Sequence, residues 1–236
     1  MILLFHMTYV ILRMVIFMKS KEFYIQKLDN ENMMSHTLLK CFDFYCFEKG
    51  QCILHQGQKL ETLYILIDGK TKSCHTTSNG ATVLIAISQG MSIIGEIELL
   101  NHRDVINDVY AMEECVCLGI SISLYQDFIL NDFIFMRYLA ETIAHKLYNS
   151  NQNSSISINY PVENRLASYL VSCEHDMIIE ENFVQVAEMI GCSYRQLQRT
   201  LNDFIQIGYI TKIKRGQFRI IDLHKLQGLS QDLYFI

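Results

Sequence analysis

Two arginines placed one helical turn apart are the residues whose type and spacing most directly indicate chemistry. Arg195 and Arg199 lie in residues 191–207, where Gly191 is a turn residue and Ser193 is a good helix N-cap. The apolar positions of this segment fall on one helical stripe, which comprises Leu197, Leu201, Phe204 and Ile205. Arginines four residues apart project from one side of a helix, and a guanidinium binds a guanine edge or a phosphate through paired hydrogen bonds. The spacing therefore predicts a helix that presents both arginines to DNA.

A second short helix is predicted directly before this segment, at residues 182–190. Asn182 and Gln185 resemble a capping box, and Ala187 is small enough for close helix contact. Two helices joined through a glycine turn are typical of a helix-turn-helix, whose second helix enters the major groove. This segment alone also fits an ordinary helical hairpin with a solvated polar face. In a helix-turn-helix, the expected DNA contacts are Ser193, Tyr194, Arg195, Gln196 and Arg199.

The segment that follows, residues 209–221, favours the helix-turn-helix over the plain hairpin. It has the pattern of two strands around a turn at Arg215 and Gly216. A hairpin beside a recognition helix is a wing, and this one is basic. Its cationic side chains are Lys212, Lys214, Arg215 and Arg219. Phosphate contacts from such a wing position a protein on DNA without specifying the base sequence.

The composition requires any DNA binding to be local. The chain has 236 residues, half of them apolar, which is enough for one large or two small domains. Its net charge is −5 and its isoelectric point is about 5.9, so it does not coat nucleic acid through bulk positive charge. We therefore expect attraction to double-stranded DNA to come from the predicted helix and wing, with the acidic remainder limiting non-specific association.

The first 18 residues are strongly apolar and contain His6 and Arg13. Three interpretations compete: a helix packed on the body, a membrane anchor, and a stretch that precedes a true start at Met18. A membrane span needs about 20 apolar residues, and a secretory signal needs a positive start and a small-residue cleavage site. We favour the start at Met18, and expect no membrane partner, a cytoplasmic location and reduced thiols.

Residues 47–120 have the pattern of an antiparallel β structure. Glycines at 50, 57, 69, 80, 90 and 95 separate short β-prone runs at 52–55, 63–67, 83–87 and 115–120. Residues 78–80, Ser-Asn-Gly, form a strong hairpin turn. Short strands at regular turn spacing predict a sandwich or roll. Residues 19–45 are expected to be mixed and mainly helical.

Several short motifs in these segments occur in the order and spacing of a known family. They are EKG at 48–50, HQG at 55–57, ETLY at 61–64, DG at 68–69, GE at 95–96 and GCS at 191–193. Through them the chain resembles the Crp/Fnr family of bacterial transcription regulators, and residues 94–100, 112–118, 164–167 and 193–195 are similar to its YeiL branch. The resemblance implies an α+β fold. Its parts would be an N-terminal cyclic-nucleotide-binding-type β-roll at 19–125, a long dimerisation helix at 126–152 and a C-terminal winged helix-turn-helix domain at 153–236.

The long helix is also predicted by the residue pattern itself, with Asn131 as cap and residues 132 to about 149 as the helix. Four apolar residues at a 3–4–4 spacing form one seam, which comprises Met136, Leu139, Ile143 and Leu147. This seam suits a contact between two copies of the helix, and equally suits packing on the chain's own sheet. The polar run at 149–155 is a candidate hinge.

The resemblance raises the question of a ligand in the roll. Family members that bind cyclic nucleotide have Gly-Glu, then a loop, then an arginine followed by a small residue and alanine. Gly95 and Glu96 match the start and mark a candidate effector pocket, but the arginine position falls near Asn107 and Asp108. Arg103 comes about four positions early. A phosphate without arginine loses its bidentate contact, and Asp108 would repel it, so we do not expect cyclic-nucleotide binding.

The cysteines offer another kind of sensor. Fnr-type members of the family hold an oxygen-labile iron–sulfur cluster with N-terminal cysteines and one from the late roll. On that resemblance the ligands here would be Cys41, Cys46, Cys52, Cys115 and Cys117. Their spacing departs from the Fnr pattern, and the last three lie on predicted strands, where buried thiols are common. We favour inert thiols and keep a redox-switched regulator as an alternative.

Enzymatic function is not expected. No pair of histidines has the HExxH spacing, His55 sits in a turn where a structural role is expected, and no Walker-type phosphate loop occurs. Glu96 and Glu98 lack an indicated cleft for acid–base work. We expect a homodimeric, sequence-specific regulator on a palindromic operator, with RNA polymerase as a further partner. A sensor that does not bind DNA and acts through protein contacts is a second alternative.

Overall fold

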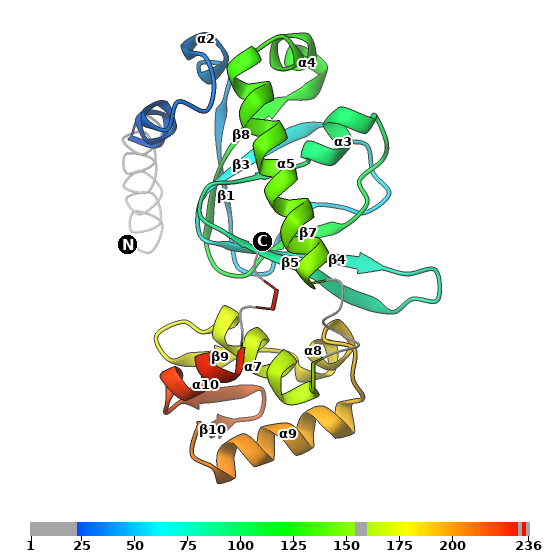
Figure 1. Ribbon diagram of the computed structural model, residues 1–236, viewed down its shortest axis with the longest axis vertical. Helices are drawn as coiled ribbons and strands as arrows, with labels where there is room; N and C mark the ends of the chain where they lie inside the picture. The colour runs from blue at the N-terminus through cyan, green and yellow to red at the C-terminus, as the bar shows by residue number, and fades with distance from the viewer. Residues whose placement is uncertain (1–22, 154–159, 231–232, 235–236) are drawn as a thin grey trace, which may run out of the picture.

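Two four-stranded antiparallel sheets form the upper part of the computed structural model, which describes residues 23–153, 160–230 and 233–234 (Figure 1). The strand orders are β1-β8-β3-β6 and β2-β7-β4-β5. The strands are β1 Asp43–Phe47, β2 Cys52–Leu54, β3 Thr62–Asp68, β4 Lys70–Thr76, β5 Thr82–Gln89, β6 Ser92–Ile94, β7 Asp108–Ala111 and β8 Cys115–Ser121. Apolar residues of both sheets are buried, and the predicted β-roll is confirmed.

Strands β1, β4, β6 and β7 were not predicted from the sequence. β1 lies partly in a region expected to be mainly helical, and its pairing with β8 over the whole of its length decides its conformation. β4 consists largely of polar residues, of which only Thr71 and Cys74 are buried. A strand with so few apolar positions gives little alternation to detect.

Gly69 joins β3 to β4 in a conformation that suits only glycine, with φ +96°. A Cβ built there would lie 2.7 Å from the Glu114 carbonyl oxygen and 2.8 Å from Cys115 Sγ. The strand β8 therefore packs against this turn without room for a side chain. Gly80 has a similar φ of +83°, but nothing lies within 4 Å of its built Cβ.

Gly69→Ala is expected to destabilise the protein more than Gly80→Ala, because only the first adds a backbone clash. The left-handed conformation alone costs an L-residue about 1–2 kcal/mol. Urea unfolding of the two variants and the parent chain measures the difference. Equal losses of unfolding free energy would show that the close approach of β8 contributes nothing.

Helix α3 Glu96–Asn101 lies between β6 and β7, and helices α4 Ile122–Leu130 and α5 Phe133–Asn153 follow β8. α5 runs diagonally along the roll (Figure 1). Asn131 ends α4, and Asp132 instead caps α5 by accepting a hydrogen bond from Phe135 N at 2.9 Å. α5 remains helical to its end at 153, so the predicted hinge at 149–155 is corrected for its first residues, and 154–159 lie outside the described residues.

The first helices of the described chain cover one side of the roll. Residues 23–30 are helical, and α2 His36–Leu39 follows. The second carboxylate oxygen of Asp132 accepts a hydrogen bond from Ser35 N at 3.1 Å, which joins the start of α2 to the start of α5. The apolar segment 1–18 lies outside the described residues. Among the helices that are described, none has the length and apolar character needed to cross a membrane.

The lower part of the molecule is a winged helix (Figure 1). Its elements are α7 Val162–Cys173, β9 Ile178–Glu180, α8 Phe183–Met189, α9 Tyr194–Gln206, β10 Ile210–Lys214, β11 Gln217–Ile220 and α10 Leu223–Ser230. The predicted hairpin pairs β10 with β11, and β9, which was not predicted, adds a third strand beside β11. β9 is short and contains only one buried residue, Ile179, so the sequence carries little signal for it.

The roll and the winged helix pack directly against each other. One apolar cluster contains Cys74, Leu84, Ile87 and Met112 from the roll together with the core of the winged helix. Lys72 Nζ donates to the Tyr169 hydroxyl at 3.4 Å, and that hydroxyl donates to Glu181 Oε2 at 3.3 Å. The second sheet and the winged helix are therefore in direct contact.

Candidate nucleic-acid interface

A capping box fixes the amino end of α9. Ser193 Oγ accepts from Gln196 N at 3.2 Å, and Gln196 Oε1 accepts from Ser193 N at 3.0 Å. The predicted N-cap at Ser193 is therefore confirmed. Gln196 was expected to assist in reading bases, but its side chain closes the box, because a glutamine three residues after a serine cap reaches the free amide. The buried face of the helix consists of Leu197, Leu201 and Phe204.

Arg165 of α7 holds the turn that precedes α9. Its side chain is only 6% exposed, and Nη1 donates to the carbonyl oxygens of Ile190 and Gly191. These carbonyls close the carboxyl end of α8, where the helix dipole favours a cation. Arg165 was not predicted from the sequence as a functional residue. The signal was an arginine directly beside the buried Leu166 in a helix that is otherwise largely apolar on that side.

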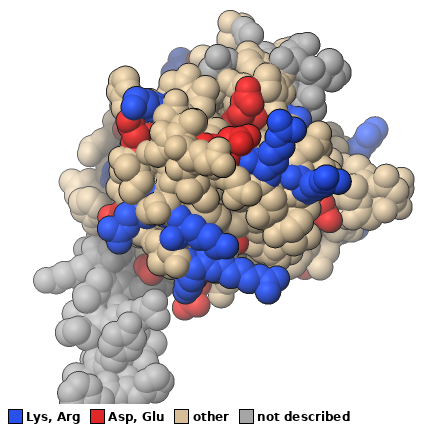
Figure 2. Space-filling view, turned by 90° about the horizontal axis from the view of Figure 1, so that it is seen from below, with Lys and Arg blue, Asp and Glu red and all other residues tan. Residues whose placement is uncertain are grey.

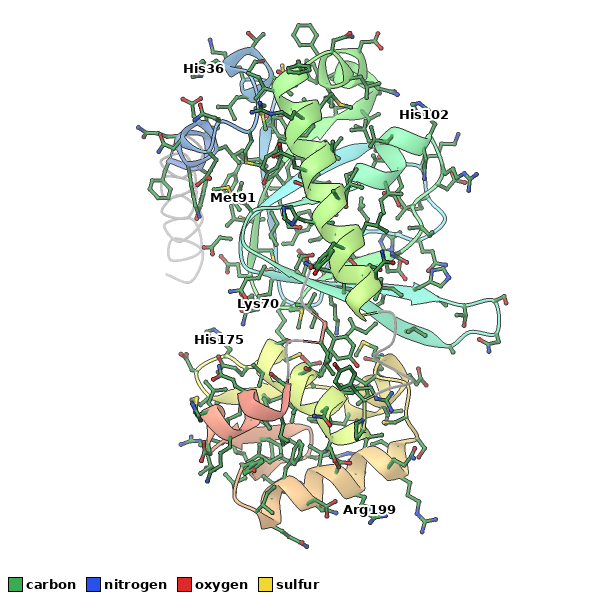
Figure 3. The ribbon with its side chains drawn as sticks, viewed as in Figure 1. His36, Lys70, Met91, His102, His175 and Arg199 are labelled. Atoms are coloured by element: carbon green, nitrogen blue, oxygen red, sulfur yellow. The ribbon has the colours of Figure 1, made fainter. Side chains whose placement is uncertain are left out.

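Arg195, Arg199 and Tyr194 lie on the side of α9 that faces solvent. Figure 3 shows Arg199 on the outer side of the helix, pointing away from the body of the protein. Within the described part of the chain, neither arginine forms an ion pair within 4.0 Å. Both guanidinium groups are therefore available to a ligand without first breaking an internal salt bridge.

The wing places further cations beside α9. Lys212, Lys214, Arg215 and Arg219 are all exposed, and Gly216 forms the turn between β10 and β11 with φ +78°. Lys214 Nζ lies 3.3 Å from Glu180 Oε1, a contact between two largely exposed side chains. Such a surface ion pair is weak, so Lys214 can leave Glu180 and bind a phosphate instead.

The winged-helix domain has no excess of positive charge, but its cations gather at one place. Residues 160–230 contain eight Lys and Arg and eight Asp and Glu. Six of the eight cations lie on α9 and the wing. Seen from below, basic side chains gather across this face (Figure 2). The arrangement can bind a polyanion at one face only, with α9 positioned to enter a groove.

Comparison with known proteins identifies both parts of the molecule. Residues 46–132 match the cyclic nucleotide-binding domain, and residues 164–229 match the Crp-like helix-turn-helix domain. The regulatory protein YeiL of Escherichia coli O157:H7 is 33% identical over 181 residues, which cover 77% of this chain and 82% of that protein. The chain belongs to the Crp/Fnr family. It is a transcription regulator with a helix-turn-helix DNA-binding domain, in a family of regulators and not of enzymes.

More distant Crp/Fnr relatives agree with this assignment. The CRP-like cAMP-activated global transcriptional regulator of Mycobacterium tuberculosis strain H37Rv is 22% identical over 178 residues, 70% of this chain and 78% of that one. A CRP-family transcriptional regulator from Thermus thermophilus has the same fold, with a TM-score of 0.65 and 17% identity over 80% of this chain and 98% of that chain.

In this Crp/Fnr protein the predicted dimer seam of α5 packs largely on its own roll. Leu139 is fully buried, and Met136 and Ile143 pack against the same core. Leu139 is therefore not available to a partner helix, because a 3–4–4 seam serves an intramolecular contact as well as a pair of helices. Met136 and Ile143 are only partly buried and Leu147 is 60% exposed, so a dimer contact through these three residues stays a prediction. The exposed side of α5 carries Phe133, Ile134, Ala140, Ala144, Leu147 and Tyr148.

A cavity of about 290 Å³ lies between α5 and the roll, at the position expected for an effector pocket. Gly95, with φ +99°, turns the chain into α3, and Glu96 is buried at the cavity wall. Lys146 Nζ lies 2.7 Å from Glu96 Oε1 and donates to the Ile93 carbonyl at 2.6 Å. Among the described residues that line the cavity, Lys146 is the only lysine, and it is already neutralised by Glu96 and bound to the backbone.

The residues of this cavity do not fit a cyclic nucleotide. Its described lining contains no arginine, and Asn107 is the residue from the expected arginine position that reaches it. Two buried carboxylates, Glu96 and Glu98, line it instead, and Glu98 is held by Ile106 N at 3.0 Å. A phosphate placed here would face two carboxylates without a bidentate partner, which is unfavourable in a partly buried site.

The five cysteines considered as cluster ligands do not face a common site. Cys46 of β1 is exposed, whereas Cys115 and Cys117 of the neighbouring strand β8 point into the buried interior of the roll. Cys52 lies on the other sheet. Cys41 lies on the loop before β1 and packs against a different apolar cluster. An iron–sulfur cluster needs its thiolates on one side of a single cavity, so this ligand set does not fit.

Burial also makes the interior thiols poor nucleophiles. Loss of solvation raises the pKa of Cys74 and Cys115 to about 11 and the pKa of Cys173 to about 12. It raises the pKa of Cys117 further still. The pKa values of these thiols in the folded protein lie above the pKa of a thiol in the unfolded chain, so burial of the neutral thiols stabilises the protein fully at neutral pH. This stabilisation is lost as the pH rises above the pKa of the unfolded state and through the pKa of the folded state.

Iodoacetamide at about pH 8 is expected to alkylate Cys46 first and to leave Cys74, Cys115, Cys117 and Cys173 unmodified in the folded protein. The reason is that only the thiolate reacts, and the interior thiols hold their protons. Mass spectrometry of peptides before and after denaturation measures each site. Rapid labelling of Cys115 or Cys117 under native conditions would contradict their placement inside the roll.

Proposed function

We propose that this protein is a homodimeric regulator that reads a palindromic operator through α9 and the wing, with the β-roll receiving or transmitting the signal. The observation that carries the proposal is the gathering of six exposed cations around the amino-terminal half of α9 and the wing, in a domain without net positive charge. Arg195 and Arg199 contact guanine or phosphate, with Tyr194 beside them. The wing residues Lys212, Lys214, Arg215 and Arg219 contact phosphates.

The homodimer is supported by the side of α5 that faces away from the roll. Phe133, Leu147 and Tyr148 are 79%, 60% and 64% exposed there, and Ala140 and Ala144 lie between them. A row of apolar and small residues lets two helices approach closely and bury these side chains. Two copies of α9 held about 34 Å apart would then enter successive major grooves on one face of the duplex.

We further propose that RNA polymerase is a partner and that the protein is located in the cytoplasm. A regulator bound beside a promoter acts through RNA polymerase. Access to the chromosome also requires a cytoplasmic location. Signals would reach the winged helix through the packed contact between the roll and α7–α9, in which Lys72 and Tyr169 take part.

Selection of bound sequences from random DNA, followed by sedimentation, tests the proposal. We expect an enriched palindrome and a dimer in solution. Ala144→Glu places a charge in the α5 face and is expected to give monomers with weakened operator binding. Ala81→Glu makes the same change on an exposed loop of the roll and should leave both properties unchanged. A parent protein that is monomeric, or a selection without a motif, would refute the proposal and favour a sensor that acts through protein contacts.

A further inference from the structure

Three side chains of metal-binding type meet on the outer face of the second sheet, away from both the α5 cavity and α9. They are Cys52 of β2, His55 in the turn after β2 and Asp108 at the start of β7. One ligand atom of each lies within 4.8 Å of the others. Antiparallel pairing of β2 with β7 brings these residues together from distant parts of the sequence.

The sheet determines the direction of two of these side chains. Ile53 and Val109, the neighbours of Cys52 and Asp108, are 7% and 6% exposed and belong to one apolar cluster inside the roll. Successive residues of a strand point to opposite faces, so Cys52 and Asp108 point outward together. The backbone hydrogen bonds between paired strands hold these side chains in place, so little conformational entropy is lost when they bind an ion.

The turn that carries His55 is also held in place. Gln56 N donates to Asp108 Oδ1 at 2.9 Å, and the Gln56 side chain both donates to and accepts from the backbone of Thr76 in β4. His55 Nδ1 lies 3.9 Å from Asp108 Oδ1 and is 56% exposed, so its ring can rotate toward an ion from solvent. The carboxylate thus already bonds a backbone amide, the kind of outer contact that orients metal ligands.

We propose that Cys52, His55 and Asp108 bind a divalent transition-metal ion of the zinc type, with the fourth position open to water or to an incoming ligand. A thiolate, an imidazole and a carboxylate form a ligand set that suits zinc and excludes magnesium and calcium, which prefer oxygen alone. Cys52 Sγ donates a hydrogen bond to the Leu54 carbonyl at 2.9 Å in this structure. Binding would release that proton to solvent and replace the hydrogen bond with a sulfur–metal bond.

The location gives the site a route to the DNA-binding domain. Tyr110 pairs with Cys52 across the ladder and lies two residues after Asp108 in β7, so the two side chains point to the same face of the sheet. Tyr110 also lines a cavity of about 450 Å³ together with Glu181, Gln185 and Glu188 from the winged helix. An ion that moved Tyr110 would therefore act at the contact between the two parts of the molecule. The metal site itself does not depend on the proposed DNA binding and is tested without DNA.

Anaerobic titration of the full chain with Co²⁺ tests the site, because cobalt replaces zinc and reports its ligands in the absorption spectrum. We expect one ion per chain, a thiolate-to-cobalt charge-transfer band, and displacement of cobalt by Zn²⁺. Cys52→Ser should remove the charge-transfer band. His55→Gln and Asp108→Asn should each weaken binding by at least about tenfold.

Two variants serve as matched controls. Cys46→Ser removes an exposed thiol of β1, and Asp104→Asn removes an exposed carboxylate of the loop before β7. Both should bind Co²⁺ like the parent chain. Circular dichroism shows whether each variant is folded, and His55→Gln, at an exposed position, keeps the test valid if Cys52→Ser unfolds. Absence of a thiolate band in the parent, its persistence in Cys52→Ser, or unchanged affinity in His55→Gln would overturn the proposal.

Discussion

Replacing Arg195 and Arg199 together by alanine is expected to remove sequence-specific operator binding while leaving the fold intact. Each arginine is exposed, and α9 is held by its capping box and by Leu197 and Leu201 on its opposite face. Loss of an arginine that contacts a base costs about 1–3 kcal/mol, so the double variant should lose about 2–6 kcal/mol of binding free energy per half-site of the operator. Fluorescence anisotropy with the selected operator measures the loss.

The single variants separate the two kinds of contact. If Arg199 reads a base, Arg199→Ala relaxes specificity at one operator position in a repeated selection. If it contacts a phosphate, affinity falls for all sequences and the slope of log K against log salt becomes shallower by about one per protomer. Arg103→Ala, at an exposed arginine of the roll, is the control and should change neither quantity. Undiminished operator binding by the double variant would show that α9 is not the recognition helix.

Arg165→Met is expected to produce a large loss of stability. The methionine keeps the buried stem but leaves the carbonyls of Ile190 and Gly191 without their donor. Each unpaired carbonyl lowers the free energy of unfolding by about 1–3 kcal/mol. Removal of the buried cation offsets part of this loss, because the Arg165 Nε has no hydrogen-bond partner among the described residues. The free energy of unfolding is therefore expected to fall by about 2–4 kcal/mol in total.

Urea unfolding monitored by circular dichroism measures this loss, and operator affinity measured on the folded variant reports whether the turn has moved. Arg103→Met is the matched control, since the same substitution at an exposed site breaks no buried hydrogen bond. If both variants lose equal stability, the Arg165 guanidinium does not hold the turn. If the Arg165 variant is less stable but binds DNA normally, the turn keeps its geometry without the arginine.

The parts of the fold that were predictable from the sequence have strong local patterns. The apolar stripe of α9, the hairpin around Gly216 and the β-prone runs between glycines each identify an element directly. β4 and β9 were not predicted, because their side chains are mainly polar or exposed and pairing with neighbouring strands decides their conformation. The seam of α5 was visible, but periodicity does not reveal whether the partner is the chain's own roll or a second helix.

Sites formed by residues far apart in sequence were less predictable for a related reason. Cys52 and His55 have a C-x2-H spacing, but two ligands alone do not predict a metal site, and Asp108 joins them only through the pairing of β2 with β7. Conversely, Cys46 and Cys117 are close in the sheet, yet they point to opposite faces. Arg165 was predictable in principle, because a cation on a buried helix face must find acceptors nearby.

The separation of charge in the winged helix also bears on how the protein meets DNA. Six of its eight Lys and Arg lie on α9 and the wing, but only one of its eight Asp and Glu, Asp203, does, so the domain behaves as an electric dipole without net charge. A duplex approaching at random exerts a torque on such a body and turns α9 toward itself before contact. Encounters in other orientations are repelled by the acidic remainder of the chain. The fraction of collisions that begin with the correct face is thereby raised, independently of how tightly the final complex is held.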